Sequence, residues 1–373
     1  MNFIRQVRLL IFFSLFWLAL YSSDTLSRGK VYLYTHDASL EWANKKSSQG
    51  YYMHEFRDAL KRLGYTPIWT NKLDGLKDFD KLVILSSVGL DVGNCIKKYS
   101  KEKIIIFLWE PPTVREDNYN NNFYRFFSKI YTWDDSLVDN KQFFHFYYPE
   151  YSPIIGEIVP FREKKLCVMM NNNKDSSHKY SLYGERKKII YFFENNYSED
   201  FDLYGSGWNG LGLKNYKGYA DSNKIDNHYW SVSKVDCINK YCFCYAYENM
   251  CNIKGYITEK ILNVFSAGCV PIYWGAENIT DYIPKNCFID RRDFSSDEQL
   301  YKFLKNMKEK EYQIYINNIK FFLDSPAALI FSTEYFVDIF LDSIEPGYDK
   351  NVALEEYQRS VLIRLYKYLG KKF

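Results

Sequence analysis

An acidic and a basic residue, Glu259 and Lys260, stand side by side in the stretch YITEKILNVFSAGCVPIYWG, residues 256–275, where a helix is expected to begin. Thr258 is the expected N-cap, and apolar residues at helical spacing follow it. A helix N-terminus attracts anions because its first N–H groups lack partners within the helix. Lys260 adds a positive charge where a carboxylate is normally favoured, so we expect it to contact an anionic ligand. The alternative is a solvated Glu/Lys pair that binds nothing.

The elements around this helix indicate a parallel α/β sheet. Gly268 stands where a left-handed C-cap residue is expected, and residues 270–274 form a short apolar run typical of a buried strand. Similar runs predict strands, some of them with the following turn, at 30–35, 81–87, 103–109, 129–133, 143–149, 165–173, 201–208, 242–249 and 287–294. Helices are expected over 51–63, after Arg186, from the capping pair Ser296 and Gln299, and in most of the chain beyond Pro326.

The chain has 373 residues, which is enough for two domains, and the predicted hinge between them lies at 149–163. We expect a signal segment and linker over 1–29, a first Rossmann-like domain over 30–160, a second over 161–325 and a helical tail over 326–373. The formal net charge is only +3, so nothing indicates a general nucleic-acid binder. The eight cysteines lack the paired spacing of a zinc site.

Residues 9–21, LLIFFSLFWLALY, form an apolar run after Arg5 and Arg8. The run has the length of a signal-peptide core and is short for a membrane span of about 20 residues. We expect a single-pass signal-anchor or an uncleaved signal with its basic side in the cytosol. The protein would then lie at a membrane, Golgi-like in a eukaryote or the inner membrane in a bacterium. The alternative is a buried or interfacial N-terminal helix.

The ordered set in YENMCNIKGYITEK, residues 247–260, is more specific than a lone Thr-Glu-Lys. It resembles the signature of the fucosyltransferases of glycosyltransferase family ten, the alpha-1,3/1,4-fucosyltransferases. In that signature a strand ending in Phe-Glu-Asn leads to a Tyr-Val-Thr-Glu-Lys helix start and then to a Pro-Ile-Tyr-Trp-Gly strand. The segment IPKNCFIDRRDF, residues 283–294, resembles the next part of the family pattern. One extra residue separates Asn249 from Tyr256, and the N-terminal unit shows little likeness.

The resemblance implies a GT-B architecture, in which two facing Rossmann-like domains enclose a deep cleft, with GDP-fucose held by the second domain. The family carries a phosphate-binding arginine at a helix start, where this chain has Arg186, and a glutamate at a strand end, where it has Glu110. The predicted donor-binding residues are Arg186, Asn249, Tyr256, Glu259 and Lys260, and the predicted catalytic base is Glu110. Ligands of open α/β sheets sit at the carboxyl ends of strands, where all these residues are expected to lie.

The predicted donor-binding residues include no Asp-x-Asp pattern that would hold a metal against a diphosphate, and Asp134 and Asp135 are adjacent and expected to begin a helix. We therefore expect neither metal nor cofactor, and cationic side chains would stabilise the leaving GDP. A carboxylate that takes the proton of the acceptor hydroxyl contributes on the order of 10²–10⁴ in rate. In the alternative interpretation, Glu110 is not the base but an acidic loop residue that pairs with Arg115. Weaker candidates for the base are Glu116, Glu157 and Glu163.

These inferences predict an inverting, metal-independent transfer of L-fucose from GDP-fucose to a glycan hydroxyl, with an alpha-1,3 linkage. The predicted partners are GDP-fucose, a glycan acceptor and, through the N-terminal segment, a membrane; no nucleic acid is expected. One alternative is a glycosyltransferase that uses another nucleotide sugar, such as GDP-mannose. The other is a catalytically inactive, membrane-tethered carbohydrate-binding protein.

Overall fold

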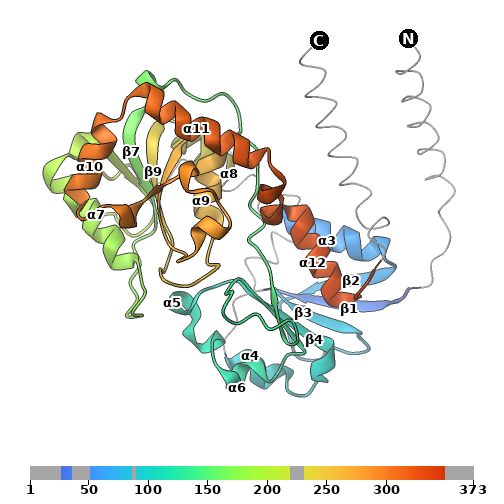
Figure 1. Cartoon of the computed structure of the whole chain (residues 1–373). Helices are drawn as coiled ribbons and strands as arrows, with labels where there is room; N and C mark the ends of the chain where they lie inside the picture. Colours follow the sequence, from blue (N-terminus) through green and yellow to red (C-terminus); the bar gives the residue numbers. More distant parts are fainter. Residues whose placement is uncertain (1–26, 36–50, 86–89, 219–230, 349–373) are drawn as a thin grey trace, which may run out of the picture.

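The computed structural model describes residues 27–35, 51–85, 90–218 and 231–348, and within them the chain forms two parallel β-sheets flanked by helices (Figure 1). The predicted α/β class with two Rossmann-like units is confirmed. The predicted apolar segment 9–21 lies outside the described residues. None of the helices that the structure describes is both long and apolar enough to span a membrane.

The N-terminal sheet consists of β1 (Gly29–Tyr34), β2 (Tyr65–Thr70), β3 (Lys81–Ile84), β4 (Ile104–Leu108), β5 (Lys129–Thr132) and β6 (Phe143–His145). Their order is β2-β1-β3-β4-β5-β6, and every pairing is parallel. The helices of this half are α3 (Tyr51–Arg62), α4 (Leu90–Ile96), α5 (Pro112–Arg115) and α6 (Asn121–Tyr124), with short 3₁₀ turns η2 (Lys101–Lys103) and η3 (Glu116–Asn118). All five residues of β4 are buried, as expected for a strand covered on both faces.

The C-terminal sheet consists of β7 (Lys165–Met170), β8 (Phe201–Tyr204), β9 (Tyr241–Tyr247), β10 (Val270–Trp274) and β11 (Ile289–Asp290). Their order is β11-β10-β9-β7-β8, again parallel throughout. The helices are α7 (Tyr183–Asn196), α8 (Ser231–Ile238), α9 (Glu259–Ser266), α10 (Asp297–Asn306) and α11 (Glu309–Leu323). The 3₁₀ turns are η4 (Phe161–Glu163), η5 (Ser198–Asp200), η6 (Ile279–Asp281), η7 (Lys285–Cys287) and η8 (Arg291–Asp293).

The strand order of the C-terminal sheet reverses between β7 and β9. In open α/β sheets, ligands bind at the carboxyl ends of the strands at such a switch point. The helix α9 and the strand β10 agree with the sequence prediction, and Gly268 has a φ of +60°, the conformation expected of a left-handed C-cap. Ser296 caps α10 as predicted, accepting a hydrogen bond from the N–H of Gln299 at 3.1 Å.

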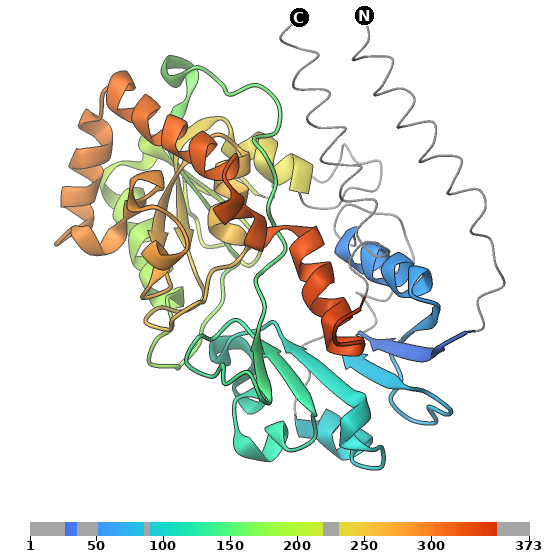
Figure 2. The same ribbon diagram turned by 45° about the vertical axis from the view of Figure 1, so that its right-hand side comes forward.

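The described part of the predicted helical tail contains a helix that packs on the N-terminal half of the chain. After η9 (Pro326–Phe331), helix α12 (Thr333–Ile344) crosses back to the N-terminal half and lies beside α3 (Figures 1 and 2). The ring of Phe56 on α3 lies 5.2 Å from that of Phe336 and stacks on that of Phe340 at 4.2 Å. Residues 349–373 lie outside the described part of the chain, so α12 is the portion of the predicted tail that can be placed.

Candidate active site

The first turn of α9 is held by a buried carboxylate from the neighbouring strand. Glu248 follows β9, is fully buried, and accepts hydrogen bonds from the N–H of Thr258 at 2.9 Å and from its Oγ1 at 2.7 Å. Thr258 occupies the predicted N-cap position, but its hydroxyl donates to Glu248 and does not cap the helix. The carboxylate of Glu248 thus occupies the N-terminus of α9, where we expected an anionic ligand. Binding of such a ligand would then depend on nearby side chains.

Lys260 lies between two carboxylates. Its Nζ is 3.2 Å from Glu248 Oε2 and 3.2 Å from Glu259 Oε1, and its side chain is 16% exposed. Burial lowers the pKa of Lys260, but the two carboxylates outweigh burial and raise it. Burial alone would raise the pKa of Glu259, whereas the charges of Lys260 and Lys234 bring it down to about 2. Both members of the pair are charged at neutral pH, and Lys260 is not the solvated lysine of the alternative interpretation.

Arg186 brings a second buried cation to the end of β9. Its Nη2 donates to the carbonyl of Tyr247 at 2.6 Å and to Asn249 Oδ1 at 3.0 Å. The residue is 4% exposed, and burial lowers the pKa of its guanidinium. Its Nε has no hydrogen-bond partner among the described residues. A buried guanidinium with an unused donor suits a phosphate oxygen, because such bonds are charge-assisted.

Asn249 and Tyr256 both contact protein groups. Asn249 accepts from Arg186, and its carbonyl accepts from the N–H of Leu182 at 3.0 Å, so it joins β9 to the start of α7. Tyr256 is 1% exposed, and its ring packs on Trp133 of the N-terminal domain with centroids 4.4 Å apart. Their roles toward a donor stay predictions, and each also orients another part of the site.

Glu110 comes from the opposite domain. It is two residues beyond β4, is partly exposed, and its carbonyl accepts from the hydroxyl of Tyr119 at 2.7 Å. Burial is the main cause that raises the pKa of Tyr256 and of Tyr183, and the charge of Glu110 raises both further. Both tyrosines belong to the C-terminal half of the chain. The charge of Glu110 therefore acts on residues of the C-terminal half of the chain.

The alternative candidates for the base are exposed, and the arginine considered as a partner of Glu110 has another contact. Arg115, considered as a partner of Glu110, lies 3.4 Å from Asp117. Glu116, Glu157 and Glu163 are all exposed. An open hollow of about 580 Å³ is lined by Val114, Arg115, Glu116, Asp117, Tyr119 and Asn120, and the hydroxyl of Tyr119 donates to the carbonyl of Glu110.

Three charged residues of the site were missing from the sequence prediction. Glu248 stood inside the recognised stretch without a role. Glu150 lies on the segment between the domains, and Lys234 lies on α8. Burial and the charge of Glu259 raise the pKa of Glu150 to about 7, and Lys234 and Lys260 oppose this rise. Glu248 could have been found from the sequence, because it directly follows a predicted strand. Glu150 and Lys234 could not, because packing between distant segments brings them near Glu259.

Asp134 and Asp135 form a turn and not the predicted helix start. Asp134 Oδ1 accepts from the N–H of Ser136 at 2.9 Å and from its hydroxyl at 2.6 Å, which closes the turn. In the described ranges no group of three or more His, Cys, Asp or Glu side chains is arranged to hold a metal ion. The independence from metal stays a prediction.

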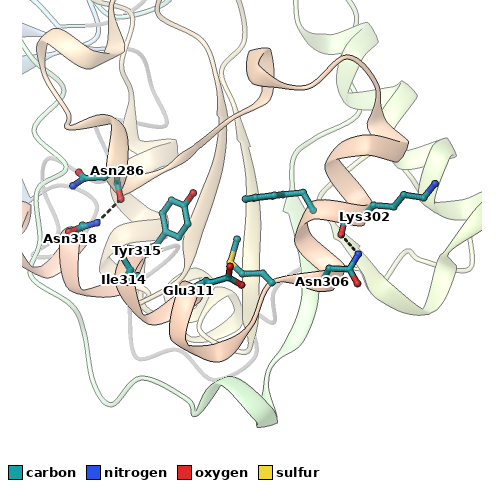
Figure 3. Close-up of a pocket in the computed structure, with 9 residues that line it drawn as sticks. Asn286, Lys302, Asn306, Glu311, Ile314, Tyr315 and Asn318 are labelled. Atoms are coloured by element: carbon teal, nitrogen blue, oxygen red, sulfur yellow. Dashed lines mark hydrogen bonds between the residues drawn. The ribbon is translucent and has the colours of Figure 1, made fainter.

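A pocket of about 650 Å³ lies elsewhere on the C-terminal domain, between α10 and α11 (Figure 3). Asn286, Lys302, Asn306, Glu311, Tyr315 and Asn318 line it together with three apolar side chains. Two of its amides are already engaged, since Asn318 Nδ2 donates to the carbonyl of Asn286 at 3.1 Å and Asn306 Nδ2 donates to the carbonyl of Lys302 at 2.9 Å. None of the predicted site residues lines this pocket, so it is separate from the cluster around Lys260.

The sequence of residues 159–322 matches the family described as "Glycosyltransferase family 10 (fucosyltransferase) C-term". This segment is similar to the C-terminal domain of glycosyltransferase family 10. It contains all five predicted donor-binding residues, whereas Glu110 lies before it. The resemblance read from residues 247–294 is therefore confirmed.

Named relatives match over part of the chain. The "4-galactosyl-N-acetylglucosaminide 3-alpha-L-fucosyltransferase 9" of Rattus norvegicus is 31% identical over 168 residues, which is 44% of this chain and 39% of that protein. The "Alpha-(1,4)-fucosyltransferase" of Arabidopsis thaliana is 36% identical over 70 residues, 19% of this chain and 17% of that protein. The chain thus spans less than half the length of these curated relatives.

Solved structures extend the likeness to both domains. A crystal structure of an alpha1,3-fucosyltransferase has a TM-score of 0.53 at 14% identity, covering 89% of this chain and 95% of that one. A glycosyltransferase from Rickettsia africae ESF-5 has a TM-score of 0.54 at 9% identity, covering 86% of this chain and 98% of that one. At such identities the likeness shows the fold alone, which is the GT-B-like glycosyltransferase fold with two parallel sheets.

Proposed function

We propose that the chain transfers L-fucose from GDP-fucose to a hydroxyl of a glycan, with inversion at the anomeric carbon. The observation that carries the proposal is the pair of cations formed by the buried Arg186 and the half-buried Lys260, which contact the end of β9 and Glu248 just after it, in a segment similar to the family 10 domain. A diphosphate that leaves with negative charge needs such cations when no metal supplies them. The name of the rat relative supports a 4-galactosyl-N-acetylglucosaminide acceptor and an alpha-1,3 linkage.

In this mechanism the donor diphosphate lies against Arg186 and Lys260. The unused Nε of Arg186 donates to a phosphate oxygen, and Asn249 holds the guanidinium in place. The ammonium group of Lys260, which pairs with Glu248 and Glu259, also contacts a phosphate oxygen. Glu259, whose carboxylate is ionised at neutral pH, accepts hydrogen bonds from ribose or sugar hydroxyls.

The acceptor approaches from the N-terminal domain. The hollow beside Tyr119 offers polar side chains for a sugar next to Glu110. Glu110 takes the proton of the attacking hydroxyl while the bond to the anomeric carbon forms and the bond to GDP breaks. Attack opposite the leaving group converts the β-linked donor into an α-fucoside.

The test is a transfer assay with the purified chain, GDP-fucose, GDP-mannose and UDP-glucose, and a 4-galactosyl-N-acetylglucosaminide acceptor. We expect the acceptor to gain a deoxyhexose, identified by mass, only with GDP-fucose, and nuclear magnetic resonance to show an α linkage. GDP, but not UDP, should raise the melting temperature, following mass action. Transfer of a hexose, or stabilisation by UDP alone, would overturn the donor assignment.

A further inference from the structure

One carboxylate of the N-terminal domain accepts hydrogen bonds from both domains. Asp135 Oδ1 lies 2.7 Å from Nε2 of His145, which is on β6, and accepts from the hydroxyl of Tyr282 at 2.7 Å. Its Oδ2 accepts from Nδ2 of Asn278 at 2.9 Å. Tyr282 and Asn278 flank η6 in the C-terminal domain. The side chain of Asp135 is 21% exposed, so water screens these contacts only in part.

The same contacts reach the loop that leads into the donor helix. Asn278 Oδ1 accepts from the N–H of Gly255 at 2.9 Å, and the N–H of Asp135 donates to the carbonyl of Lys254 at 3.3 Å. Gly255 has a φ of +80°, and a Cβ placed on it would stand 2.2 Å from the carbonyl oxygen of Trp133. Residues 254 and 255 are therefore fixed directly against residues 133–135.

Asp135 stands between the predicted base and the predicted donor site. On one side, β5 pairs with β4 with Thr132 opposite Leu108, so Asp135 and Glu110 follow neighbouring strands at the same edge of the sheet. On the other side, the loop it holds continues within five residues to Lys260. Hydrogen bonds are directional, so the two that Asp135 accepts across the interface, from Tyr282 and Asn278, constrain both the distance and the angle between the domains.

We propose that Asp135 is a positioning residue that fixes Glu110 relative to the Lys260 donor site. The inference rests on the proposed function. Domains joined by a linker move relative to one another unless their interface holds them, and a displacement of about 1 Å can cost on the order of 10² in rate. Asp135 touches no reacting atom; it acts by holding the two halves of the site at one separation.

The first test is Asp135→Asn. Asparagine has one acceptor oxygen, and its Nδ2 would face the Nδ2 of Asn278, so at least one hydrogen bond across the interface is lost. We expect kcat to fall about tenfold or more, with GDP binding unchanged, because Arg186 and Lys260 are both in the C-terminal domain. Tyr282→Phe removes a single hydroxyl and should give a smaller fall of the same kind.

Asp139→Asn is the matched control. Asp139 follows in the same connection, is exposed, and its Oδ1 accepts only from N–H groups of its own domain, at Lys141, Gln142 and Phe143. This variant should keep the wild-type kcat. A fall in kcat equal to that of Asp135→Asn would show that the effect is general destabilisation and would overturn the proposal.

A double-mutant cycle separates positioning from folding. In a Glu110→Gln background the base is gone, so its position no longer matters and Asp135→Asn should cost little further rate. If the two effects multiply, Asp135 does not act through Glu110 and the proposal is wrong.

A readout that needs no substrate completes the test. Hydrogen–deuterium exchange at residues 253–258 should quicken about fivefold or more in Asp135→Asn and not in Asp139→Asn. Unchanged exchange would contradict the link between Asp135 and the donor loop. Absence of fucose transfer by the wild-type chain would instead defeat the proposed function, and the exchange result would still decide whether Asp135 holds the loop.

Discussion

At the scale of single residues, the site depends on charges that are buried together. Glu248 is fully buried and 3.2 Å from Lys260, which also pairs with Glu259 at 3.2 Å. Removing one member of such a group leaves another buried charge without its partner, which is costly. The arrangement keeps Lys260 charged inside the protein, ready to contact a phosphate.

The first prediction concerns Lys260→Met, which keeps the aliphatic stem and removes the charge. The dissociation constant for GDP should rise about 10- to 100-fold, because a charge-assisted hydrogen bond is lost. Isothermal titration calorimetry measures it. Lys302→Met is the control, since Lys302 also pairs with a glutamate, Glu298 at 3.1 Å, but is 67% exposed on α10. Equal GDP affinity in the two variants would show that Lys260 does not bind the donor.

The second prediction concerns the pH dependence of stability. The pKa of Glu150 is about 7 in the folded protein, against an ordinary value of 4.5. Because the folded value is the higher one, the protonated carboxyl stabilises the fold at low pH, and this contribution is lost as the pH rises through about 7. Glu150→Gln cannot ionise, so its free energy of unfolding relative to wild type should rise by about 1–3 kcal/mol between about pH 4 and pH 8.

Urea denaturation at the two pH values checks this prediction. Glu157→Gln, at an exposed glutamate of the same segment, should show no such change. A relative stability of Glu150→Gln that stays constant or falls with pH would mean that Glu150 is ionised at neutral pH in the folded chain.

At the scale of elements, α12 ties the end of the described chain to the N-terminal domain. Phe340 is fully buried and stacks on Phe56 at 4.2 Å. Phe340→Ala should therefore lower the free energy of unfolding by about 3–5 kcal/mol. Phe321 on α11 is 79% exposed, and Phe321→Ala should change stability by no more than about 0.5 kcal/mol. Similar losses in the two variants would contradict the packing of α12 on α3.

The strands were predictable because their signals are local. Residues 270–274 carry an apolar run bounded by Gly275, and the structure places β10 at those residues. Gly268 likewise signals the end of α9 through its own conformational freedom. The return of α12 to the N-terminal domain depends on contacts between residues almost 300 positions apart, Phe56 and Phe340, which no local pattern encodes.

The candidate site shows the same division. Glu259 and Lys260 were found because they fall in a motif with a fixed order. Glu150 was missed because only packing between distant segments brings it near them, and the turn at Asp135 was missed because its partners, Tyr282 and Asn278, are distant in sequence. The hydrogen bonds that Asp135 accepts from Tyr282 and Asn278 outweigh the local preference for a helix start.

At the scale of the whole molecule, the proposed function assigns the two sheets different parts of one reaction. The C-terminal domain carries the predicted donor-binding cations, and the N-terminal domain carries Glu110, the predicted base, and the hollow lined by Tyr119. Parallel sheets place ligand-binding residues at the carboxyl ends of their strands, so two facing sheets bring donor and acceptor together.

The fourth prediction is that transfer survives EDTA. A missed metal site would be sought at Asp134, Asp135 and Asp290. Asp135 accepts a hydrogen bond from Asn278, and Asp290 pairs with Arg292 at 2.8 Å and with Lys285 at 3.1 Å. Arg186 and Lys260 would supply the charge that a metal supplies elsewhere. Activity lost in EDTA and restored by Mn²⁺ would contradict this account.

The most direct measurement is the transfer rate of Glu110→Gln with GDP-fucose. Glutamine keeps the size of the side chain but cannot take the proton, so the rate should fall by roughly 10² or more. GDP affinity should remain that of the wild type, and the decline in rate toward acid pH should disappear. Glu116→Gln, at an exposed glutamate of the nearby turn, should stay fully active. Near-normal transfer by folded Glu110→Gln would contradict the assignment and move the search for the base to Glu116, Glu157 and Glu163.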